Sequence, residues 1–149
     1  MDKVAQAAAA EAAQESLWTS EDLEQAPPTK ECLKRVRQDY KAFLRDELHG
    51  IYCVPNDSIA IKYHALIVGP FDTPYEGGFF IFTIVFPPTY PNEPPFIKFE
   101  TTGSGQVRLN PNLYRNGKVC LSILGTKGGD NEWTPTQNLS SILVSIQVS

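Results

Sequence analysis

The sequence predicts a single domain of the α+β class, with an N-terminal helix, a four-stranded antiparallel meander, a long irregular segment and the start of a second helix. Apolar residues first recur at spacings of three and four, and then occur in short runs separated by Pro and Gly. The connections between these runs are too short for a crossover helix, so neighbouring strands should pair antiparallel. A chain of 149 residues is long enough to bury one hydrophobic core.

Residues 1–28 are expected to be a flexible, acidic tail rich in Ala and Glu. They contain six acidic residues against one lysine, a net charge of −5, and few large apolar side chains that could be buried. Residues 29–149 should therefore form the folded domain, and their net charge is +1. This balance gives no basic field that would favour nucleic acid as a partner.

An amphipathic helix is predicted over residues 30–46, with Thr29 as its N-cap. One face is apolar and another is basic. Two interpretations of the basic stripe stay open at this point, a solvated helix face and a docking face for a partner. The apolar residues are Leu33, Val36, Tyr40, Phe43 and Leu44, and the basic ones are Lys30, Lys34, Arg37, Lys41 and Arg45.

Four strands are expected after this helix. Ile51–Val54 is short, and residues 59–67 alternate between apolar and smaller or polar side chains, which is typical of a half-buried strand. Phe79–Phe86 is rich in Phe, Ile and Val, which indicates burial of much of its surface. The fourth strand is Phe96–Phe99.

Residues 101–135 show no regular period, and irregular segments of this length in a compact domain tend to be functional. This segment contains Cys120. After Pro135 a second helix is predicted, and it should run to the end of the chain with no C-terminal cap signal. Its apolar residues at helical spacing are Leu139, Ile142, Leu143 and Ile146.

The chain has three widely spaced cysteines and two histidines. No CxxC pair occurs, so no structural metal site is expected. Free thiols are typical of a reducing compartment, which favours the cytoplasm and also the nucleus. No apolar run approaches the length of a membrane span, and the N-terminus lacks the layout of a secretory signal.

A cysteine nucleophile of the hydrolase type needs a nearby base to form a thiolate. His49 is expected at the end of the first helix and His64 within a strand, so structural or surface roles are predicted for both. This argues against a papain-like hydrolase. It permits a cysteine that exchanges one thioester for another, because that reaction depends on positioning and oxyanion stabilisation more than on a strong base.

The segment around Cys120 resembles the active-site stretch of ubiquitin-conjugating enzymes. Residues 110–124 read NPNLYRNGKVCLSIL, and Asn112 stands eight residues before the cysteine, as in that family's His-Pro-Asn motif. Three further family motifs follow the expected order: Gly69-Pro70 through PYEGG at 74–78, FPPTYP at 86–91 with Pro94-Pro95, and Trp133-Thr134-Pro135 before the last helix.

Asn110 replaces the histidine of that motif, and an amide can also donate and accept the hydrogen bonds that hold the loop. With the residues that follow it, the Asn-Pro-Asn form resembles the Z-type branch of the family. That branch is associated with an alternative ubiquitin-activating enzyme and, in some members, with a second ubiquitin-like modifier.

The resemblance implies a UBC-like fold and a role for each matched residue. Cys120 would accept the C-terminus of ubiquitin, or of a ubiquitin-like modifier, from the thioester of an activating enzyme. Asn112 would donate its amide to the oxyanion when a substrate lysine attacks, or would hold the loop that permits the attack. Leu121 would point into the core behind the cysteine. No cofactor is implied, because the upstream partner consumes the ATP.

Partner surfaces follow from the same resemblance. Lys34 and Arg35 match positions that dock the activating enzyme, which favours the docking interpretation of the basic stripe. Ubiquitin ligases would contact Asn92 and the region of Trp133, Pro135 and Thr136. Relatives often carry a large apolar residue where this chain has Asn92, so weaker or more selective ligase binding is one interpretation and ordinary loop variation is the other.

The family domain continues beyond the position of Ser149 with two further helices, so the chain is expected to be incomplete at its C-terminal side. The segment 125–132 is about five residues longer than the common form. It could reshape the approach of the lysine, or it could be a tolerated insertion. Two alternatives to an active enzyme are a ubiquitin-binding variant without catalysis, which the presence of Cys120 argues against, and a truncated, inactive domain.

Overall fold

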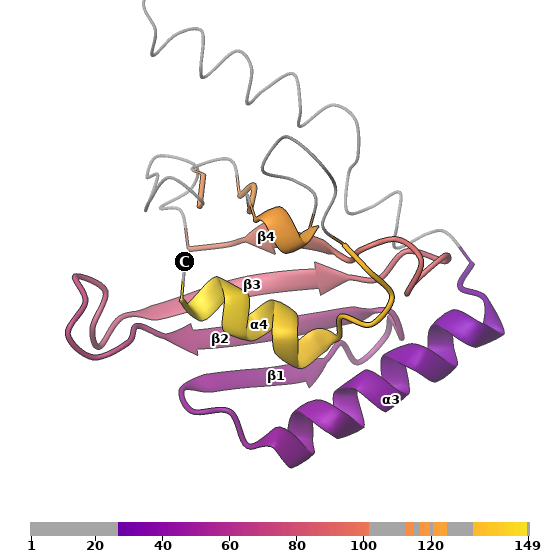
Figure 1. Ribbon diagram of the computed structural model, residues 1–149, viewed down its shortest axis with the longest axis horizontal. Helices are drawn as coiled ribbons and strands as arrows, with labels where there is room; N and C mark the ends of the chain where they lie inside the picture. Colours follow the sequence, from indigo (N-terminus) through magenta and orange to yellow (C-terminus); the bar gives the residue numbers. More distant parts are fainter. Residues whose placement is uncertain (1–26, 102–112, 115–116, 120, 125–132, 149) are drawn as a thin grey trace, which may run out of the picture.

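The structure, a computed structural model, describes residues 27–101, 113–114, 117–119, 121–124 and 133–148. Among these residues, one α-helix precedes a sheet, and a short 3-10 helix and a further α-helix follow it (Figure 1). The elements are α3 (Lys30–Asp46), β1 (Ile51–Pro55), β2 (Lys62–Val68), β3 (Phe79–Val85), β4 (Phe96–Phe99), η1 (Ser122–Leu124) and α4 (Leu139–Gln147). This confirms the predicted α+β class and the order of its elements.

The four strands form one antiparallel sheet in the order β1-β2-β3-β4. A row of buried side chains crosses it, because Ala65 lies opposite both Cys53 and Phe82, and Phe82 lies opposite Phe99. Alternate residues along β1 and β2 are buried, as the period of two requires. The meander predicted from the short connections is therefore confirmed, with its core-facing residues in register.

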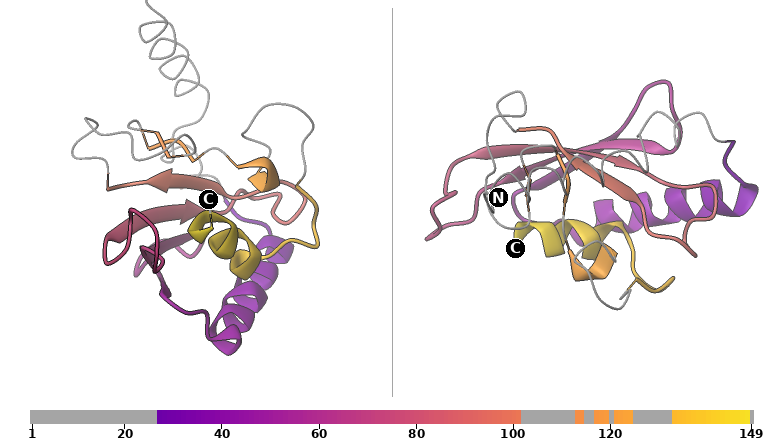
Figure 2. Two further views of the ribbon diagram at one scale, coloured as in Figure 1. Left: turned by 60° about the vertical axis from the view of Figure 1, so that its left-hand side comes forward. Right: turned by 90° about the horizontal axis from the view of Figure 1, so that it is seen from above.

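Both α-helices lie on the same face of the sheet (Figure 2). Helix α4 runs across the middle of that face, where Leu139, Ile142 and Leu143 are fully buried. Helix α3 lies beside β1 and packs against α4. The hydrophobic core therefore lies between one face of the sheet and the two helices.

Helix α3 has the predicted bounds, and the Thr29 hydroxyl caps it by accepting from the amide of Cys32. Its buried face differs from the predicted apolar stripe. Val36 and Phe43 are buried, but Leu44 is 56% exposed, so its placement in the stripe was wrong. The buried face instead includes Cys32 and Asp39. The buried face therefore overlaps the predicted stripe only in part, and both Cys32 and Asp39 have polar partners inside the domain.

The second strand begins later than predicted, at Lys62, and Ile59 lies in the turn before it. The Asn56 side chain accepts hydrogen bonds from the amides of Ser58 and Ile59. An Asx-type turn of this kind competes with the extended conformation and reverses the chain. The strand therefore starts only after the turn is complete.

Helix α4 begins at a capping box in which Asn138 and Ser141 exchange side-chain and backbone hydrogen bonds. It is bonded to α3 near its start and to the loop after α3 at its end. The hydroxyl of Ser140 donates to Asp46 at 2.6 Å, and the side-chain amide of Gln147 donates to the carbonyl of His49 at 2.9 Å. These bonds hold α4 against α3 and the loop that follows it.

Candidate functional site

The two residues predicted to be catalytic, Asn112 and Cys120, lie outside the described residues, and so does the segment 125–132. The residues between and after them are described in part. Leu113 pairs with Val119 in an antiparallel bridge, and the Tyr114 amide donates to the Lys118 carbonyl at 3.0 Å. The chain immediately before Cys120 is thus one arm of a hairpin whose other arm begins immediately after Asn112.

This hairpin is fastened to the outer edge of β4. Lys98 pairs with Lys118 in an antiparallel bridge, and the Phe99 amide donates to the Gly117 carbonyl at 2.7 Å. Gly117 has a φ of 91°, which suits glycine, and its amide donates to the Tyr114 carbonyl. The hairpin therefore extends the sheet beyond its fourth strand and takes its position from it.

Behind the hairpin the chain returns to the core. Leu113, Val119, Leu121 and Leu124 are all buried, which agrees with the inward orientation predicted for Leu121. Apolar anchors thus lie on both sides of position 120 in the sequence. Since η1 also contacts α4, the segment that follows Cys120 is held by the same core as the sheet.

The two described cysteines are poor nucleophiles. Cys32 is fully buried, its thiol donates to the Pro87 carbonyl, and burial raises its pKa. Cys53 lies on β1 with its side chain in the core, where burial raises its pKa to about 12. Both thiols are therefore protonated and shielded at neutral pH, and thiolate chemistry at either one is disfavoured.

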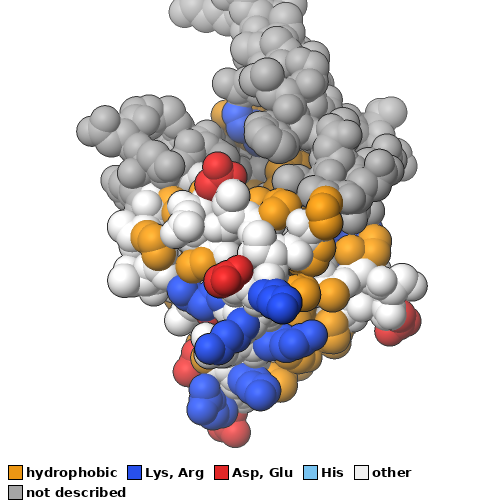
Figure 3. Space-filling view, turned by 90° about the vertical axis from the view of Figure 1, so that its right-hand side faces the viewer, with side chains coloured by type: hydrophobic (Ala, Val, Ile, Leu, Met, Phe, Trp, Pro, Cys, Tyr) orange, Lys and Arg blue, Asp and Glu red, His pale blue; other side chains and the backbone are white. Residues whose placement is uncertain are grey.

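The basic stripe of α3 is exposed. Figure 3 shows a cluster of Lys and Arg side chains gathered on this face of the molecule. A shallow groove follows it, and Lys34, predicted to dock the activating enzyme, is exposed there. The groove is lined by Lys30, Leu33, Lys34, Arg37, Gln38 and Lys41.

Arg35, predicted to act with Lys34, points in a different direction. Its side chain is only 24% exposed, and its Nε lies 2.8 Å from Oδ1 of Asp39. Its Nη2 donates to the carbonyl of Gln137 at 2.7 Å, and its guanidinium lies over the ring of Tyr90. The structure thus separates two neighbouring residues that the sequence grouped, because Lys34 faces solvent and Arg35 faces the interior.

The predicted ligase-binding residues are brought together. Asn92 follows the turn that contains Tyr90, whose bond to Pro91 is cis, and the Trp133 indole donates to the Pro91 carbonyl at 2.8 Å. Asn92, Pro135 and Thr136 are exposed, whereas Trp133 is buried. Trp133 therefore supports the surface, and the other three residues are accessible on it.

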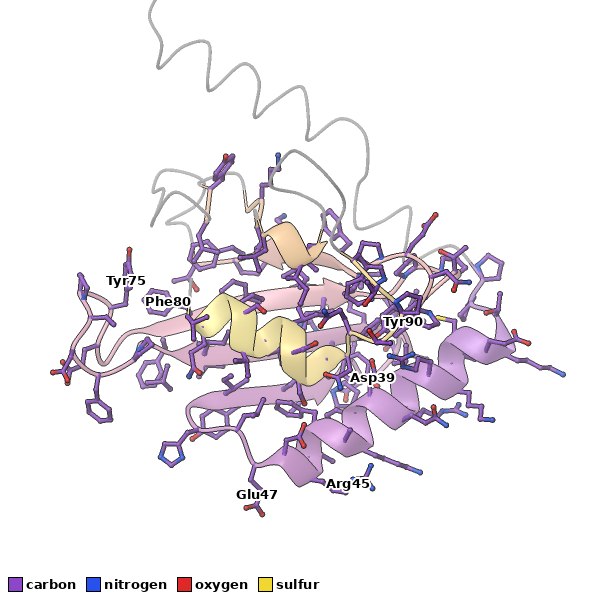
Figure 4. All side chains as sticks on the ribbon, in the orientation of Figure 1. Asp39, Arg45, Glu47, Tyr75, Phe80 and Tyr90 are labelled. Atoms are coloured by element: carbon purple, nitrogen blue, oxygen red, sulfur yellow. The ribbon has the colours of Figure 1, made fainter. Side chains whose placement is uncertain are left out.

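Asp39 and Tyr90 were not singled out as a pair by the sequence. The Tyr90 hydroxyl donates a short hydrogen bond to Oδ2 of Asp39, and Figure 4 shows the two side chains meeting between α3 and the turn after β3. Burial, this bond and the charge of Asp39 raise the pKa of Tyr90. An acidic residue on an otherwise apolar helix face was the signal that could have found Asp39.

Neither histidine is placed for catalysis within the part of the chain that the structure describes. His49 is exposed in the loop after α3, and Nε2 of His64 lies 3.0 Å from the side-chain amide nitrogen of Asn56. No group of three or more metal-ligating side chains occurs among the described residues. In the same described ranges, no helix is both long and apolar enough to cross a membrane.

A family model described as ubiquitin-conjugating enzyme matches residues 35–148. The chain belongs to the ubiquitin-conjugating enzyme family. A solved structure of a ubiquitin-conjugating enzyme E2 from Plasmodium falciparum shares the fold, with a TM-score of 0.67 and 24% identity over 77% of this chain and 94% of that one.

Among curated members of the ubiquitin-conjugating enzyme family, two Z-type relatives support the branch that the motifs predict. Ubiquitin-conjugating enzyme E2 Z of Xenopus tropicalis is 50% identical over 135 residues, covering 89% of this chain and 43% of the relative. The Homo sapiens protein of the same name is 54% identical over 117 residues, covering 78% of this chain and 33% of the relative. The chain thus spans less than half the length of these two relatives.

Proposed function

We propose that this protein is a ubiquitin-conjugating enzyme that carries ubiquitin as a thioester on Cys120 and passes it to a lysine amine or to a ligase. The hairpin of residues 113–119 carries this proposal. Paired antiparallel residues have Cα atoms roughly 5 Å apart. Leu113 and Val119, which directly follow Asn112 and directly precede Cys120 in the sequence, form such a pair.

The pairing of these two neighbours supports the roles assigned to Asn112 and Cys120. A side-chain amide must reach the oxyanion that develops on the thioester carbon, and the loss of one such donor costs about 3 kcal/mol of barrier in other enzymes. The β4 edge and the buried residues of the hairpin fix both flanks before substrate arrives. The reaction then requires positioning, which the fold supplies, and no strong base.

The chemistry of the other thiols supports the choice of Cys120. Of the three cysteines, Cys32 and Cys53 are buried and have raised pKa values, so they are not expected to accept an acyl group. Their free state also fits a reducing compartment such as the cytoplasm or nucleus. Modifier loading should therefore occur at a single site.

The partner surfaces form part of the same proposal. Lys34, in the exposed groove on α3, would contact the activating enzyme through its charge. A ligase would contact Asn92, Pro135 and Thr136. All three are exposed, and the bond from the Trp133 indole to the Pro91 carbonyl joins the two segments that carry them. The two surfaces are made by different segments of the chain, since the first lies on α3 and the second is made by Asn92, Pro135 and Thr136.

The test mixes the chain with ubiquitin, ATP and a ubiquitin-activating enzyme, including the alternative activating enzyme that the Z-type resemblance implies. We expect an adduct that thiol reductants remove, and a reductant-resistant ester when Cys120→Ser is used. A Cys32→Ala, Cys53→Ala double variant should still load. Loading that persists in Cys120→Ala, or that is absent with every activating enzyme while the chain is folded, would contradict the proposal.

The role of Asn112 is tested separately with a preloaded thioester and free lysine as the acceptor amine. Asn112→Ala should load normally and discharge more slowly, by about 100-fold if the full oxyanion contribution is lost. Asn112→Asp is the matched control, since it keeps the volume and removes the donor. Discharge at the wild-type rate in both variants would remove Asn112 from the mechanism.

A further inference from the structure

Three segments that are far apart in the sequence meet at Arg35 and Asp39. Arg35 donates from Nε to Oδ1 of Asp39, one helical turn along α3, and from Nη2 to the carbonyl of Gln137, just before α4. The other oxygen of Asp39 accepts from the hydroxyl of Tyr90, in the turn after β3. The planar guanidinium can serve two acceptors at once because its donors are fixed in a fork.

The carboxylate of Asp39 is almost completely enclosed, since only 5% of the residue is exposed. Both of its oxygens are used, and the described residues contain no buried side-chain polar atom without a partner. A buried charge of this kind is tolerated only while its hydrogen bonds are complete. The pair is therefore built into the domain and is not an accidental surface contact.

The network fastens residues 133–138 at both ends. At one end the indole of Trp133 donates to the carbonyl of Pro91, and at the other end the carbonyl of Gln137 accepts from Arg35. Between these points a turn is closed by the bond from the Gln137 amide to the Thr134 carbonyl. The exposed residues Pro135 and Thr136 are carried on this turn.

We propose that Arg35 and Asp39 are positioning residues that preform the surface made by Asn92 and residues 134–136, and that Arg35 does not dock the activating enzyme. The ligase role of that surface rests on the function proposed above. The assignment of Arg35 rests on its own contacts, since its Nε donates to Asp39 and its Nη2 donates to the carbonyl of Gln137. Lys34, one residue earlier, remains available to the activating enzyme.

Conservative substitutions separate the two roles. If Arg35 supplied only positive charge, Arg35→Lys would be nearly silent. A single ammonium cannot reproduce the planar guanidinium that donates from Nε and Nη2 to two acceptors. A positioning role therefore predicts that Arg35→Lys does not preserve the surface and resembles Arg35→Gln. Lys34 is the matched control, because Lys34→Arg keeps the charge of an exposed side chain and Lys34→Gln removes it.

We would make these four variants in a Trp18→Phe background, so that Trp133 is the only tryptophan. Amide hydrogen exchange of residues 133–138 should be about tenfold faster in both Arg35 variants, and Trp133 emission should shift to the red. Hydrogen exchange in β1–β3 should stay within twofold of wild type. The KM of the activating enzyme for this chain in the loading reaction should also stay within twofold. Lys34→Gln should raise that KM severalfold and leave exchange unchanged, and Lys34→Arg should change neither.

Wild-type exchange and emission in Arg35→Lys would overturn the proposal. A raised loading KM in both Arg35 variants, with an unchanged Trp133 environment, would also overturn it, because that result would indicate that Arg35 docks the activating enzyme. If Arg35→Gln fails to fold, Tyr90→Phe tests the same network, since it removes only the hydroxyl and should speed exchange at 133–138 to a smaller extent. If wild type fails to load with any activating enzyme, the proposed function fails, yet exchange and fluorescence still decide the role of Arg35.

Discussion

Gly117 lies so close to Lys98 that a Cβ atom at position 117 would be 2.8 Å from Cγ of Lys98 and 3.0 Å from the carbonyl oxygen of Phe99. Its φ of 91° is also one that other residues rarely adopt. The contact therefore joins the hairpin that precedes Cys120 to the edge of the sheet through a position where only glycine fits. The backbone at that position is as important to the site as the side chains beside it.

Gly117→Ala should destabilise the domain by about 2–3 kcal/mol, because it adds a steric clash to an unfavourable φ. Urea unfolding measures this, and thioester loading should fall with it. Gly77→Ala is the matched control, since Gly77 has a φ of 76° and nothing within 4 Å of its Cβ position. It should cost only about 1 kcal/mol. Equal effects of the two substitutions would show that close packing at position 117 is unimportant.

Phe43→Ala should lower the free energy of unfolding by about 3–5 kcal/mol, whereas Leu44→Ala should change it by less than about 0.5 kcal/mol. The two residues are neighbours on α3, but Phe43 is 6% exposed and Leu44 is 56% exposed. Chemical denaturation of both variants checks which side of the helix faces the core. A large cost for Leu44→Ala would restore the stripe predicted from the sequence.

Stability should fall as the pH rises above about 9. The pKa of Cys53 is raised by burial to about 12 in the folded protein, so between pH 9 and 12 the unfolded chain loses a proton that the folded chain keeps. This favours unfolding by up to about 1.4 kcal/mol per pH unit.

Urea unfolding of Cys53→Ala at several pH values measures the contribution of this thiol. The variant should be less stable than wild type at pH 7. Its free energy of unfolding should decline less steeply above pH 9. Some decline should remain, because burial also raises the pKa of Tyr63 and Tyr90. A slope identical to that of wild type would show that Cys53 does not titrate differently on folding.

Reversing the charge of Lys30, Lys34 and Lys41 together should slow loading and reduce its dependence on salt. These lysines line the exposed groove, and charge on a docking surface acts mainly on the rate of association. Stopped-flow or single-turnover loading at two ionic strengths measures the effect. Discharge of a preloaded thioester to free lysine should be unchanged. Equal losses in loading and discharge would indicate damage to the fold.

The sequence alone was sufficient for much of the fold, because the deciding signals are local. Thr29 as N-cap, the paired prolines after Phe86 and the alternation along β2 each depend on nearby residues. The position of Ile59 could not be predicted from alternation, because the Asn56 side chain overrides it with a turn. Element boundaries depend on such side-chain bonds more than element types do.

The candidate site, too, could be predicted from the sequence only in part. Motif spacing identified Cys120 and Asn112, and both stay predictions because they lie outside the described residues. Arg35 was grouped with Lys34 because both match docking positions of the family, and a match of positions says nothing of the direction in which a side chain points. The partners of Arg35 are four residues and more than a hundred residues away. Only the tertiary structure brings Gln137 and Tyr90 to the same guanidinium.

The position of the hairpin on β4 also protects the protein from association with itself. An unpaired strand at the edge of a sheet exposes backbone groups that can pair with another chain. Here the Phe99 amide is already bonded to Gly117, and Lys98 is bridged to Lys118. The segment that leads to the proposed nucleophile thus closes one edge of the sheet, and substitutions that release it should promote aggregation as well as slow catalysis.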